Sequence, residues 1–379
     1  MTGRDSATIL AVDGIVPAKV RRMDTSRWRA TGEMRELDGG EMTVRVGING
    51  FGRIGRNFLR AARESTAEIE IVAVNDLLSP QINAHLLRYD STYGRFPGTV
   101  EVQGSDIIVD GHTIKVFAER DPAALRWGEI GVDVVVESTG RFTKREAAAA
   151  HLSGGAKRVV ISAPSGDADA TFVIGVNEGD FDAAKHFVIS NASCTTNCFV
   201  PMIKVLDDAF GVEKGLMTTV HAYTNDQELL DFARDNLRRA RAAAVNIVPT
   251  STGAARATNL VMANMKGRLD GSALRVPIPV GSITDFTGVL GAATDATGVN
   301  AAFAAAAKAG PLSKVLVYTE DPIVSSDVVG SPASCTFDSG LTLAMGLDQG
   351  RTLVKVFGWY DNEWGYSHRL VELVALVGS

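Results

Sequence analysis

The first half of the chain alternates short apolar runs with amphipathic segments. Runs rich in valine and isoleucine are typical of buried strands, and they fall at 43–49, 68–75, 132–137 and 158–162. Helical periodicity fills the gaps, at 56–64, 82–88 and 145–150. Residues 98–118 are predicted to form short strands, with Asp110-Gly111 as a hairpin turn. Strands and helices in this alternation predict a parallel sheet with helices on its faces.

The pattern changes at residue 194. A helix is predicted at about 195–209 and a strand near 215–221, and an arginine-rich stretch without periodicity, 222–244, is expected to be an extended loop. Further strands are predicted at 274–276, 282–289 and 353–360, with one helix at 300–309. Strands beside strands with one helical layer indicate an α+β domain. The last segment, 362–378, is predicted to be a helix that packs back on the first domain. We expect one domain of residues 43–193 with 362–379 and a second domain of residues 194–361.

Residues 1–42 differ from the rest in composition. They contain seven Lys or Arg and seven Asp or Glu residues, and they lack the apolar stretch of a secretory signal. We interpret them as a disordered or mis-annotated extension. Gly39-Gly40-Glu41 would be encoded by a purine-rich stretch just before the Met42 codon, which resembles a translated ribosome-binding site. Our hypothesis is that Met42 is the true start, and the intact mass of the natively expressed protein would test it.

Composition narrows the class of protein. The 379 residues are 45% hydrophobic and 22% charged, and no apolar run has the length of a membrane span. The formal net charge of −6 argues against nucleic-acid binding as the primary role. Three cysteines argue against a disulfide scaffold and favour a reducing cytoplasm, and we interpret Cys198 and Cys335 as core residues. We expect no membrane or nucleic-acid partner and no metal site.

A glycine motif follows the first predicted strand. Gly50, Gly52 and Gly55 form G-x-G-x-x-G between a strand and a helix, and Asp76 ends the second strand. The glycines permit a tight turn and bring a pyrophosphate close to the helix N-terminus. A carboxylate at Asp76 would bond ribose hydroxyls and repel a 2′-phosphate, so NAD is the expected cofactor. These features predict a Rossmann-type domain, with a strand–helix turn that binds no ligand as the alternative.

A cysteine follows at the start of a predicted helix. The segment SNASCTTNC (190–198) places Cys194 at a loop-to-helix junction. Aligned N–H groups at a helix N-terminus stabilise a thiolate. The hydroxyl groups of Ser193 and Thr195, which flank the cysteine, suit an oxyanion or a phosphate. Cys194 is therefore the candidate nucleophile.

His221 ends the predicted strand at 215–221. A lone histidine there can be a satisfied polar residue, but paired with Cys194 it would lower the thiol pKa and supply a general base. Ser251-Thr252-Gly253 is of the type that wraps a phosphate with backbone N–H groups. The nearby basic residues are Arg238, Arg239 and Arg241 in the long loop and Arg275 on a strand. An anionic substrate is expected, although the arginine-rich loop can also be solvated or face another subunit.

Six motifs resemble those of the phosphorylating glyceraldehyde-3-phosphate dehydrogenase family. They occur in order within about residues 43–377 and are NGFGRIGR (49–56), SNASCTTNC (190–198), HAYTNDQ (221–227), LRRARAAA (237–244), PTSTGAA (249–255) and WYDNEWGYS (359–367). The resemblance implies an NAD-dependent enzyme that converts D-glyceraldehyde 3-phosphate and inorganic phosphate to 1,3-bisphosphoglycerate, in glycolysis or gluconeogenesis. It also implies a cytoplasmic homotetramer.

The resemblance implies a role for each matching residue. Cys194 attacks the aldehyde to give a hemithioacetal, His221 takes the hydroxyl proton as hydride leaves for NAD, and phosphate then attacks the thioester. Cofactor contacts are implied for Gly50, Gly52, Arg53, Ile54, Gly55, Asp76, Arg120, Ser162 and Asn362. Thr224 and Arg275 match the substrate-phosphate site, Ser193, Thr195, Thr252 and Gly253 match the inorganic-phosphate site, and Arg239 reaches between the two.

The sequence departs from the family pattern in the long loop. Phe232-Ala233-Arg234 stands where many members have Leu-Pro-His, in a stretch that approaches a neighbouring subunit's cofactor, and the arginine would ease use of NADP as a minor alternative. Two other functions remain open. One is erythrose-4-phosphate dehydrogenase, whose members usually depart from the motifs intact here at 223–226 and 251–255. The other is a catalytically silent, NAD-binding regulatory homologue, although no matched catalytic position is substituted.

Overall fold

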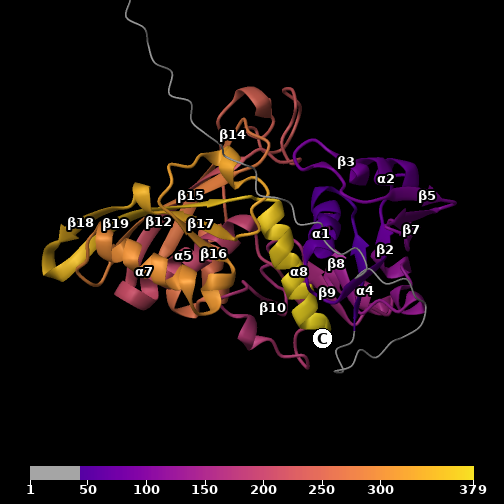
Figure 1. Cartoon of the computed structure of the whole chain (residues 1–379), viewed down its shortest axis with the longest axis horizontal. Coiled ribbons are helices and arrows are strands. Elements are labelled where there is room, and N and C mark those ends of the chain that lie inside the picture. Colours follow the sequence, from indigo (N-terminus) through magenta and orange to yellow (C-terminus); the bar gives the residue numbers. More distant parts are fainter. Residues whose placement is uncertain (1–42) are drawn as a thin grey trace, which may run out of the picture. The chain divides into compact units, whose positions relative to one another are not determined.

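Two large β-sheets organise residues 43–379, the part of the chain that this computed structural model describes (Figure 1). Residues 1–42, interpreted above as an extension, lie outside the described residues. The first sheet has nine strands. In spatial order they are β10 (Ala170–Thr171), β11 (Val188–Ser190), β9 (Arg158–Ile161), β8 (Val134–Glu137), β1 (Val44–Asn49), β2 (Ile69–Asn75), β7 (His112–Phe117), β6 (Asp106–Val109) and β5 (Val100–Gln103).

The first sheet is parallel from β10 to β7, as the alternation of strands and helices predicted. Strands β7, β6 and β5 form an antiparallel meander that includes the predicted turn at Asp110-Gly111. The inner strands are buried on both faces, which explains their continuous valine and isoleucine runs. The helices of this half are α1 (Arg53–Glu64), α2 (Pro80–Arg88), α3 (Arg145–Ala148) and α4 (Ala150–Ser153), and β3 (Tyr89–Asp90) pairs with β4 (Gly94–Arg95) in a separate ribbon.

The second sheet is mixed and mainly antiparallel, as expected for an α+β unit. Its order is β13 (Val248–Ser251), β14 (Leu269–Val276), β12 (Val212–Ala222), β15 (Ser282–Leu290), β19 (Arg351–Tyr360), β17 (Cys335–Asp338) and β16 (Leu316–Thr319), with β18 (Leu343–Leu347) paired to β19. The strands β13, β16, β17 and β18 and the helix α6 (Ala254–Val261) were not predicted. These elements are short and lie at or near the sheet edges, where few apolar positions repeat.

Helices connect the two halves of the molecule. Helix α5 (Cys194–Phe210) packs on β12, β15, β17 and β19, and α7 (Ala296–Lys308) lies beside it. The C-terminal helix α8 (Trp364–Gly378) packs against α1 and against β1, β8 and β9, so the prediction that it returns to the first sheet is confirmed (Figure 1). The stretch 223–242 has no helix or strand, which confirms the loop predicted at 222–244 except at its ends: Ala222 belongs to β12, and a short 3-10 helix begins at Ala243. No helix within residues 43–379 is both long and apolar enough to cross a membrane.

Candidate active site

Cys194 is the first residue of α5, directly after the loop that leaves β11. Ser193 caps this helix, because its Oγ accepts a hydrogen bond from the backbone N–H of Thr196 at 3.0 Å. Ala192, one residue earlier, has a φ of +55°, a left-handed conformation that turns the chain sharply into the helix. The thiol therefore stands at a helix N-terminus, as the sequence predicted, with intermediate exposure.

His221 lies near the end of β12 and faces the thiol. Its Nε2 is 3.4 Å from Sγ of Cys194, and its Nδ1 is 2.6 Å from the carbonyl oxygen of Ala222. A carbonyl oxygen only accepts hydrogen bonds, so Nδ1 carries the ring proton when the imidazole is neutral. The unprotonated Nε2 is then free to accept the thiol proton, which is the arrangement that a general base requires.

The pKa values of this pair correct one expectation. Desolvation raises the pKa of the Cys194 thiol to about 11, although the charge of Arg275 and the backbone N–H of Thr195 act in the opposite direction. Desolvation and the charge of Arg275 lower the pKa of His221 to about 4. We expected the histidine to lower the thiol pKa, but removal from water outweighs the helix N-terminus here. Both shifts favour a neutral thiol beside a neutral imidazole at pH 7.

A buried tyrosine joins the two elements that bear this pair. The Tyr360 hydroxyl, at the end of β19, lies 2.8 Å from Oγ1 of Thr195 on α5 and 2.8 Å from Oγ1 of Thr219 on β12. The Tyr360 ring also packs edge-on to the His221 ring, with 6.0 Å between the ring centroids. No pattern in the sequence indicates this role for Tyr360. Its bonds fix the spacing between helix and strand, and hence between thiol and imidazole.

The glycine motif forms a tight turn from β1 into α1. Gly50 has a φ of +91°, and a Cβ there would lie 2.7 Å from the backbone nitrogen of Thr139, so a side chain is excluded. Gly52 precedes the helix without any side-chain cap, and a Cβ built on it meets nothing within 4 Å. The space beside the Gly52 Cα is thus open, which would let a pyrophosphate approach the first N–H groups of α1.

The predicted cofactor residues of the first half follow the carboxyl ends of parallel strands. Asp76 follows β2, and its carboxylate accepts the N–H of Phe51 and the N–H of Leu78, both at 2.9 Å. Arg120, after β7, is exposed, and Ser162, after β9, is partly exposed. Carboxyl ends of parallel strands share one edge of the sheet, where dinucleotides bind in such folds.

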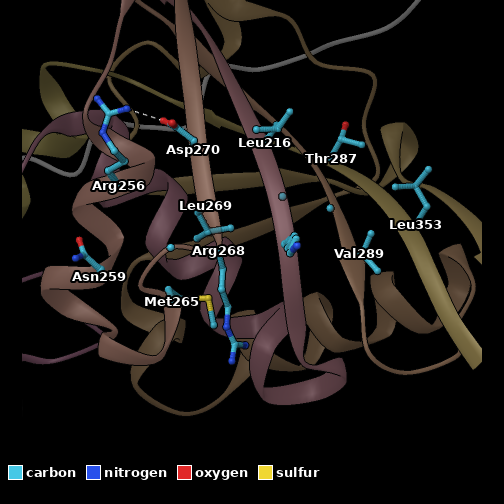
Figure 2. A pocket seen from close by; sticks show the side chains of 14 residues that line it. Leu216, Arg256, Asn259, Met265, Arg268, Leu269, Asp270, Thr287, Val289 and Leu353 are labelled. Atoms are coloured by element: carbon cyan, nitrogen blue, oxygen red, sulfur yellow. Dashed lines mark hydrogen bonds and ion pairs between the residues drawn. The ribbon is translucent and has the colours of Figure 1, made fainter.

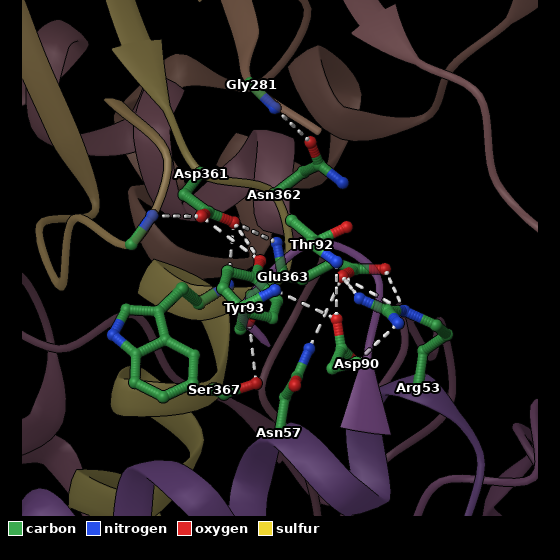
Figure 3. A network of polar contacts seen from close by, with 12 residues as sticks. Arg53, Asn57, Asp90, Thr92, Tyr93, Gly281, Asp361, Asn362, Glu363 and Ser367 are labelled. Carbon is green, nitrogen blue, oxygen red and sulfur yellow. Dashed lines mark hydrogen bonds and ion pairs between the residues drawn. The ribbon is translucent and has the colours of Figure 1, made fainter. Parts of the chain in front are cut away.

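The side chain of Arg53, a residue expected to contact the cofactor, is bound by two carboxylates of the protein. Its guanidinium forms an ion pair with Asp90 at 2.7 Å and bonds both carboxylate oxygens of Glu363 (Figure 3). Tyr93, three residues after Asp90, donates its hydroxyl to Asp361 at 2.9 Å. The side chain of Arg53 thus ties α1 to the start of α8, and its backbone N–H remains as the group that a dinucleotide can reach.

Asn362 lies between the two carboxylates of this network, at the junction of β19 and α8. It is buried, and its Oδ1 accepts hydrogen bonds from the N–H of Gly281 at 3.2 Å and from the hydroxyl of Ser282 at 3.0 Å. The carbonyl end of the amide is therefore fixed by the second sheet. The amide NH2 group is the end left to donate a hydrogen bond to a cofactor.

Three of the predicted phosphate ligands form one cluster. Arg275 donates to the hydroxyl of Thr224, Arg239 pairs with Asp226, and the same Asp226 accepts the hydroxyl of Thr224. Arg239 also donates its Nε to Oγ1 of Thr250 at 3.0 Å. Arg239 thus reaches from the Thr224 cluster to β13, the strand that leads to Thr252 and Gly253 at the start of α6. Neither Thr252 nor Gly253 hydrogen-bonds to Cys194 or His221.

Sequence reasoning also missed a buried polar chain beneath the glycine motif. Trp127 donates Nε1–H to Nδ1 of His151 at 3.0 Å, so the other ring nitrogen, Nε2, carries the proton and donates to Glu137 at 3.0 Å. Asn49 donates to Glu137 and accepts from Asn75. These bonds fix the ends of β1, β2 and β8. Among residues 43–379, no group of His, Cys, Asp and Glu side chains is placed to hold a metal ion.

Comparison with known proteins agrees with this geometry. Residues 44–145 match the family model of the glyceraldehyde 3-phosphate dehydrogenase NAD binding domain, and residues 193–362 match that of the C-terminal domain. Curated relatives include glyceraldehyde-3-phosphate dehydrogenase 2 of Streptomyces avermitilis and glyceraldehyde-3-phosphate dehydrogenase of Streptomyces coelicolor, each 60% identical over 338 residues. The enzyme of Mycobacterium avium is 59% identical over 343 residues. Each match covers 89% of this chain and 99% of the relative.

The Rossmann-type sheet, its glycine turn and the matching NAD binding domain define an NAD-dependent dehydrogenase with an α/β cofactor domain and a C-terminal catalytic domain. Within that class, the chain belongs to the glyceraldehyde 3-phosphate dehydrogenase family, whose reaction is a step of glycolysis. Its substrates are small molecules. The erythrose-4-phosphate dehydrogenase and silent-homologue alternatives are not favoured by these matches.

Proposed function

We propose that this chain converts D-glyceraldehyde 3-phosphate, NAD and inorganic phosphate to 1,3-bisphosphoglycerate, with Cys194 as nucleophile and His221 as base. The observation that carries the proposal is the 3.4 Å approach of Sγ to Nε2, with the opposite ring nitrogen committed to the Ala222 carbonyl. That tautomer leaves a lone pair directed at the thiol. A neutral pair has to move a proton before the sulfur can attack, and this geometry supplies the acceptor.

The proposed steps use the pair twice. His221 takes the Cys194 proton as sulfur attacks the aldehyde carbon, and the proton passes to the aldehyde oxygen to complete a hemithioacetal. His221 then removes that hydroxyl proton while the carbon loses hydride; bound NAD supplies the hydride acceptor. Inorganic phosphate attacks the thioester carbon, the carbon–sulfur bond breaks, and the imidazolium returns its proton to Cys194. Hydride leaves more readily from an alkoxide than from a hydroxyl, so removal of the hydroxyl proton by His221 assists hydride transfer.

We assign the binding residues as follows. The backbone of the glycine turn holds the pyrophosphate, and Asp76 holds the ribose. The cofactor set is Gly50, Gly52, Arg53, Ile54, Gly55, Asp76, Arg120, Ser162 and Asn362, with Arg53 acting through its backbone. Thr224 and Arg275 hold the substrate phosphate, Ser193, Thr195, Thr252 and Gly253 hold inorganic phosphate, and Arg239 reaches between the two sites. The first domain then comprises residues 43–193 with 362–379, and the catalytic domain comprises residues 194–361.

Reduction of NAD tests this assignment directly. We expect NADH formation with D-glyceraldehyde 3-phosphate to require inorganic phosphate for turnover. Without phosphate, only one equivalent per Cys194 is expected, because the thioester accumulates. Erythrose 4-phosphate is the comparison substrate, and faster turnover with it would contradict the proposal. No NADH formation with either aldehyde would support a silent homologue instead. We place the reaction in the cytoplasm, where glycolytic substrates occur.

We also propose that four copies of this chain assemble. One support is the outer face of the second sheet, where alternate residues of β12, β15 and β19 remain partly exposed. Leu216 is 68% exposed there, and a groove of about 650 Å³ beside it is lined by Met265, Val289 and Leu353 (Figure 2). Monomers rarely leave an apolar sheet face uncovered, and a second copy placed symmetrically would cover it.

The long loop offers a second apolar surface. Leu229, Leu230, Phe232 and Leu237 are each at least 68% exposed. Two separate self-complementary surfaces are what a tetramer with two-fold axes needs, whereas a dimer needs one. Leu216→Glu should reduce the mass in light scattering from four chains to two, and Leu216→Ile should not. A parent protein whose mass in light scattering equals that of a single chain would contradict the assembly.

A further inference from the structure

The cluster of predicted phosphate ligands already contains an anion of its own. Asp226 lies beside the side chains of Thr224, Arg239 and Arg275. Its Oδ2 pairs with Nη1 of Arg239, and its Oδ1 accepts a hydrogen bond from the hydroxyl of Thr224. Nη1 of Arg275 is 3.7 Å from Oδ1. The loop motif was noted in the sequence only for its resemblance, and no role was given to this aspartate.

The single hydroxyl proton of Thr224 shows what binding a phosphate requires. That proton is donated to Asp226, and the Thr224 oxygen accepts a hydrogen bond from Arg275. A hydroxyl has one proton to donate. Thr224 can therefore donate to a substrate phosphate only after its bond to Asp226 breaks, so the carboxylate and the phosphate compete for one donor.

The Nε–H of Arg275 is a hydrogen-bond donor that can still bind the substrate phosphate. Its Nη1 is shared between Thr224 and the carbonyl oxygen of Ala222, while its Nε is buried and has no hydrogen-bond partner among residues 43–379. Only 14% of its side chain is exposed, so this N–H has little access to water. A buried donor without a partner costs free energy until an acceptor arrives.

The charge of Asp226 is maintained by its surroundings. Burial acts to raise its pKa, but the hydrogen bond from Thr224 and the charges of Arg275 and Arg239 outweigh burial and lower it. The carboxylate is therefore ionised at neutral pH. It neutralises one of two neighbouring guanidinium charges and keeps both side chains in place while no substrate is bound.

We propose that Asp226 is a built-in competing anion: it holds Thr224, Arg239 and Arg275 in position, and the substrate's phosphate displaces its carboxylate from them. The proposal deepens the substrate-phosphate assignment made above and rests on it. Like-charge contact between the displaced carboxylate and the phosphate dianion lowers affinity for bound substrate and product alike. Asp226 therefore sets how tightly the site binds a phosphate ester, and it does so by weakening that binding.

Asp226→Asn separates charge from shape. An asparagine has nearly the same shape, and its one carbonyl oxygen can still accept from Thr224. It removes the negative charge and replaces the oxygen that pairs with Arg239 by an NH2 group. We expect the inhibition constant of glycerol 3-phosphate, a phosphate ester without an aldehyde, to fall roughly tenfold, together with the KM for D-glyceraldehyde 3-phosphate. KM for D-glyceraldehyde, which lacks the phosphate, should not change. The matched control is Asp208→Asn, which removes a carboxylate paired with Lys204 at 2.6 Å on the exposed surface of α5 and should alter none of these constants.

A second variant distinguishes failure of this proposal from failure of the site. Arg275→Gln should raise the KM for D-glyceraldehyde 3-phosphate by a much larger factor than the KM for D-glyceraldehyde, if Arg275 binds the phosphate. Were Arg275→Gln to change neither constant, both the phosphate assignment and the role of Asp226 would be overturned. If Arg275→Gln weakens binding but Asp226→Asn leaves the inhibition constant unchanged or raises it, Asp226 only orients the arginines, and the competing-anion proposal alone is wrong.

Discussion

Nε2 of His221 approaches the sulfur of Cys194 to 3.4 Å while Nδ1 of the same ring is held by the neighbouring carbonyl at 2.6 Å. The hydrogen bond from Nδ1 to the carbonyl selects the tautomer in which the Nε2 lone pair faces the thiol. Nucleophile and base come from different elements, the start of α5 and the end of β12. Their spacing therefore depends on how the helix is seated on the second sheet.

Replacement of the nucleophile is the simplest test. Cys194→Ser should abolish turnover but leave the fold and NAD binding intact, because a serine hydroxyl in the same place has no comparable nucleophilicity. Turnover is measured by NADH formation, and cofactor binding by quenching of protein fluorescence. Alkylation of the parent protein should modify Cys194 before Cys198 or Cys335, which are both fully buried. Labelling of Cys335 first, with activity retained, would show that the assignment is wrong.

His221→Asn should lower kcat by roughly 10²–10⁴-fold, the usual contribution of a positioned general base. Asparagine cannot accept the thiol proton and become a cation. The alkylation rate of the thiol between pH 7 and pH 9, where a neutral His221 can take the thiol proton as sulfur attacks, should therefore fall. In the parent protein, that rate should still be rising above pH 9, because the thiol pKa is about 11. Identical profiles for the two proteins would mean that the thiol and the imidazole are not coupled.

Acid should destabilise the fold through the same histidine. The pKa of His221 is lowered to about 4 by desolvation and by Arg275, against an ordinary value of 6.5. A lowered folded-state pKa gives stability that is present above pH 6.5 and is lost as the pH falls toward 4. We expect His221→Asn to lose about 2–3 kcal/mol less than the parent protein between pH 7 and 4.5. Denaturant unfolding at both pH values measures this, and equal losses would contradict it.

The sequence predicts the fold and the site well where the apolar periodicity and the chemistry of the residues indicate the same structure. The parallel sheet follows from buried apolar runs separated by helices, and the turn at Gly50 follows from a backbone angle that only glycine adopts readily. The place of Cys194 at a helix N-terminus was also predictable from its polar neighbours. Even the return of α8 to the first sheet could be anticipated from its apolar pattern.

Contacts between distant segments were not predictable in the same way. Nothing near Arg53 in the sequence indicates that its guanidinium is bound by Glu363, which is 310 residues away. Tyr360 resembles any strand residue until the fold brings two threonine hydroxyls to it. The thiol pKa was expected to fall because local charge was considered alone. Desolvation is set by the surrounding fold, and here it has the larger effect.

Cofactor choice depends on two opposing charges, and the structure changes their balance. Asp76 is fixed by two backbone N–H groups, so its carboxylate cannot move away from a 2′-phosphate. Arg234, which the sequence suggested would favour NADP, forms an ion pair with Glu228 of its own loop. The positive charge of Arg234 is therefore already compensated within its own loop. Its side chain is 39% exposed, so solvent and salt weaken its effect further.

We therefore predict that kcat/KM with NAD exceeds that with NADP by at least about tenfold, equivalent to roughly 1.4 kcal/mol. Asp76→Ala should raise kcat/KM with NADP, because the repulsion is removed. Arg234→Ala should change it little, whereas Glu228→Gln, which frees the Arg234 charge, should raise it at low salt and lose that gain as salt increases. Steady-state kinetics with both cofactors decides the matter. Equal use of NADP by the parent protein would show that the loop, and not the Asp76 carboxylate, sets the preference.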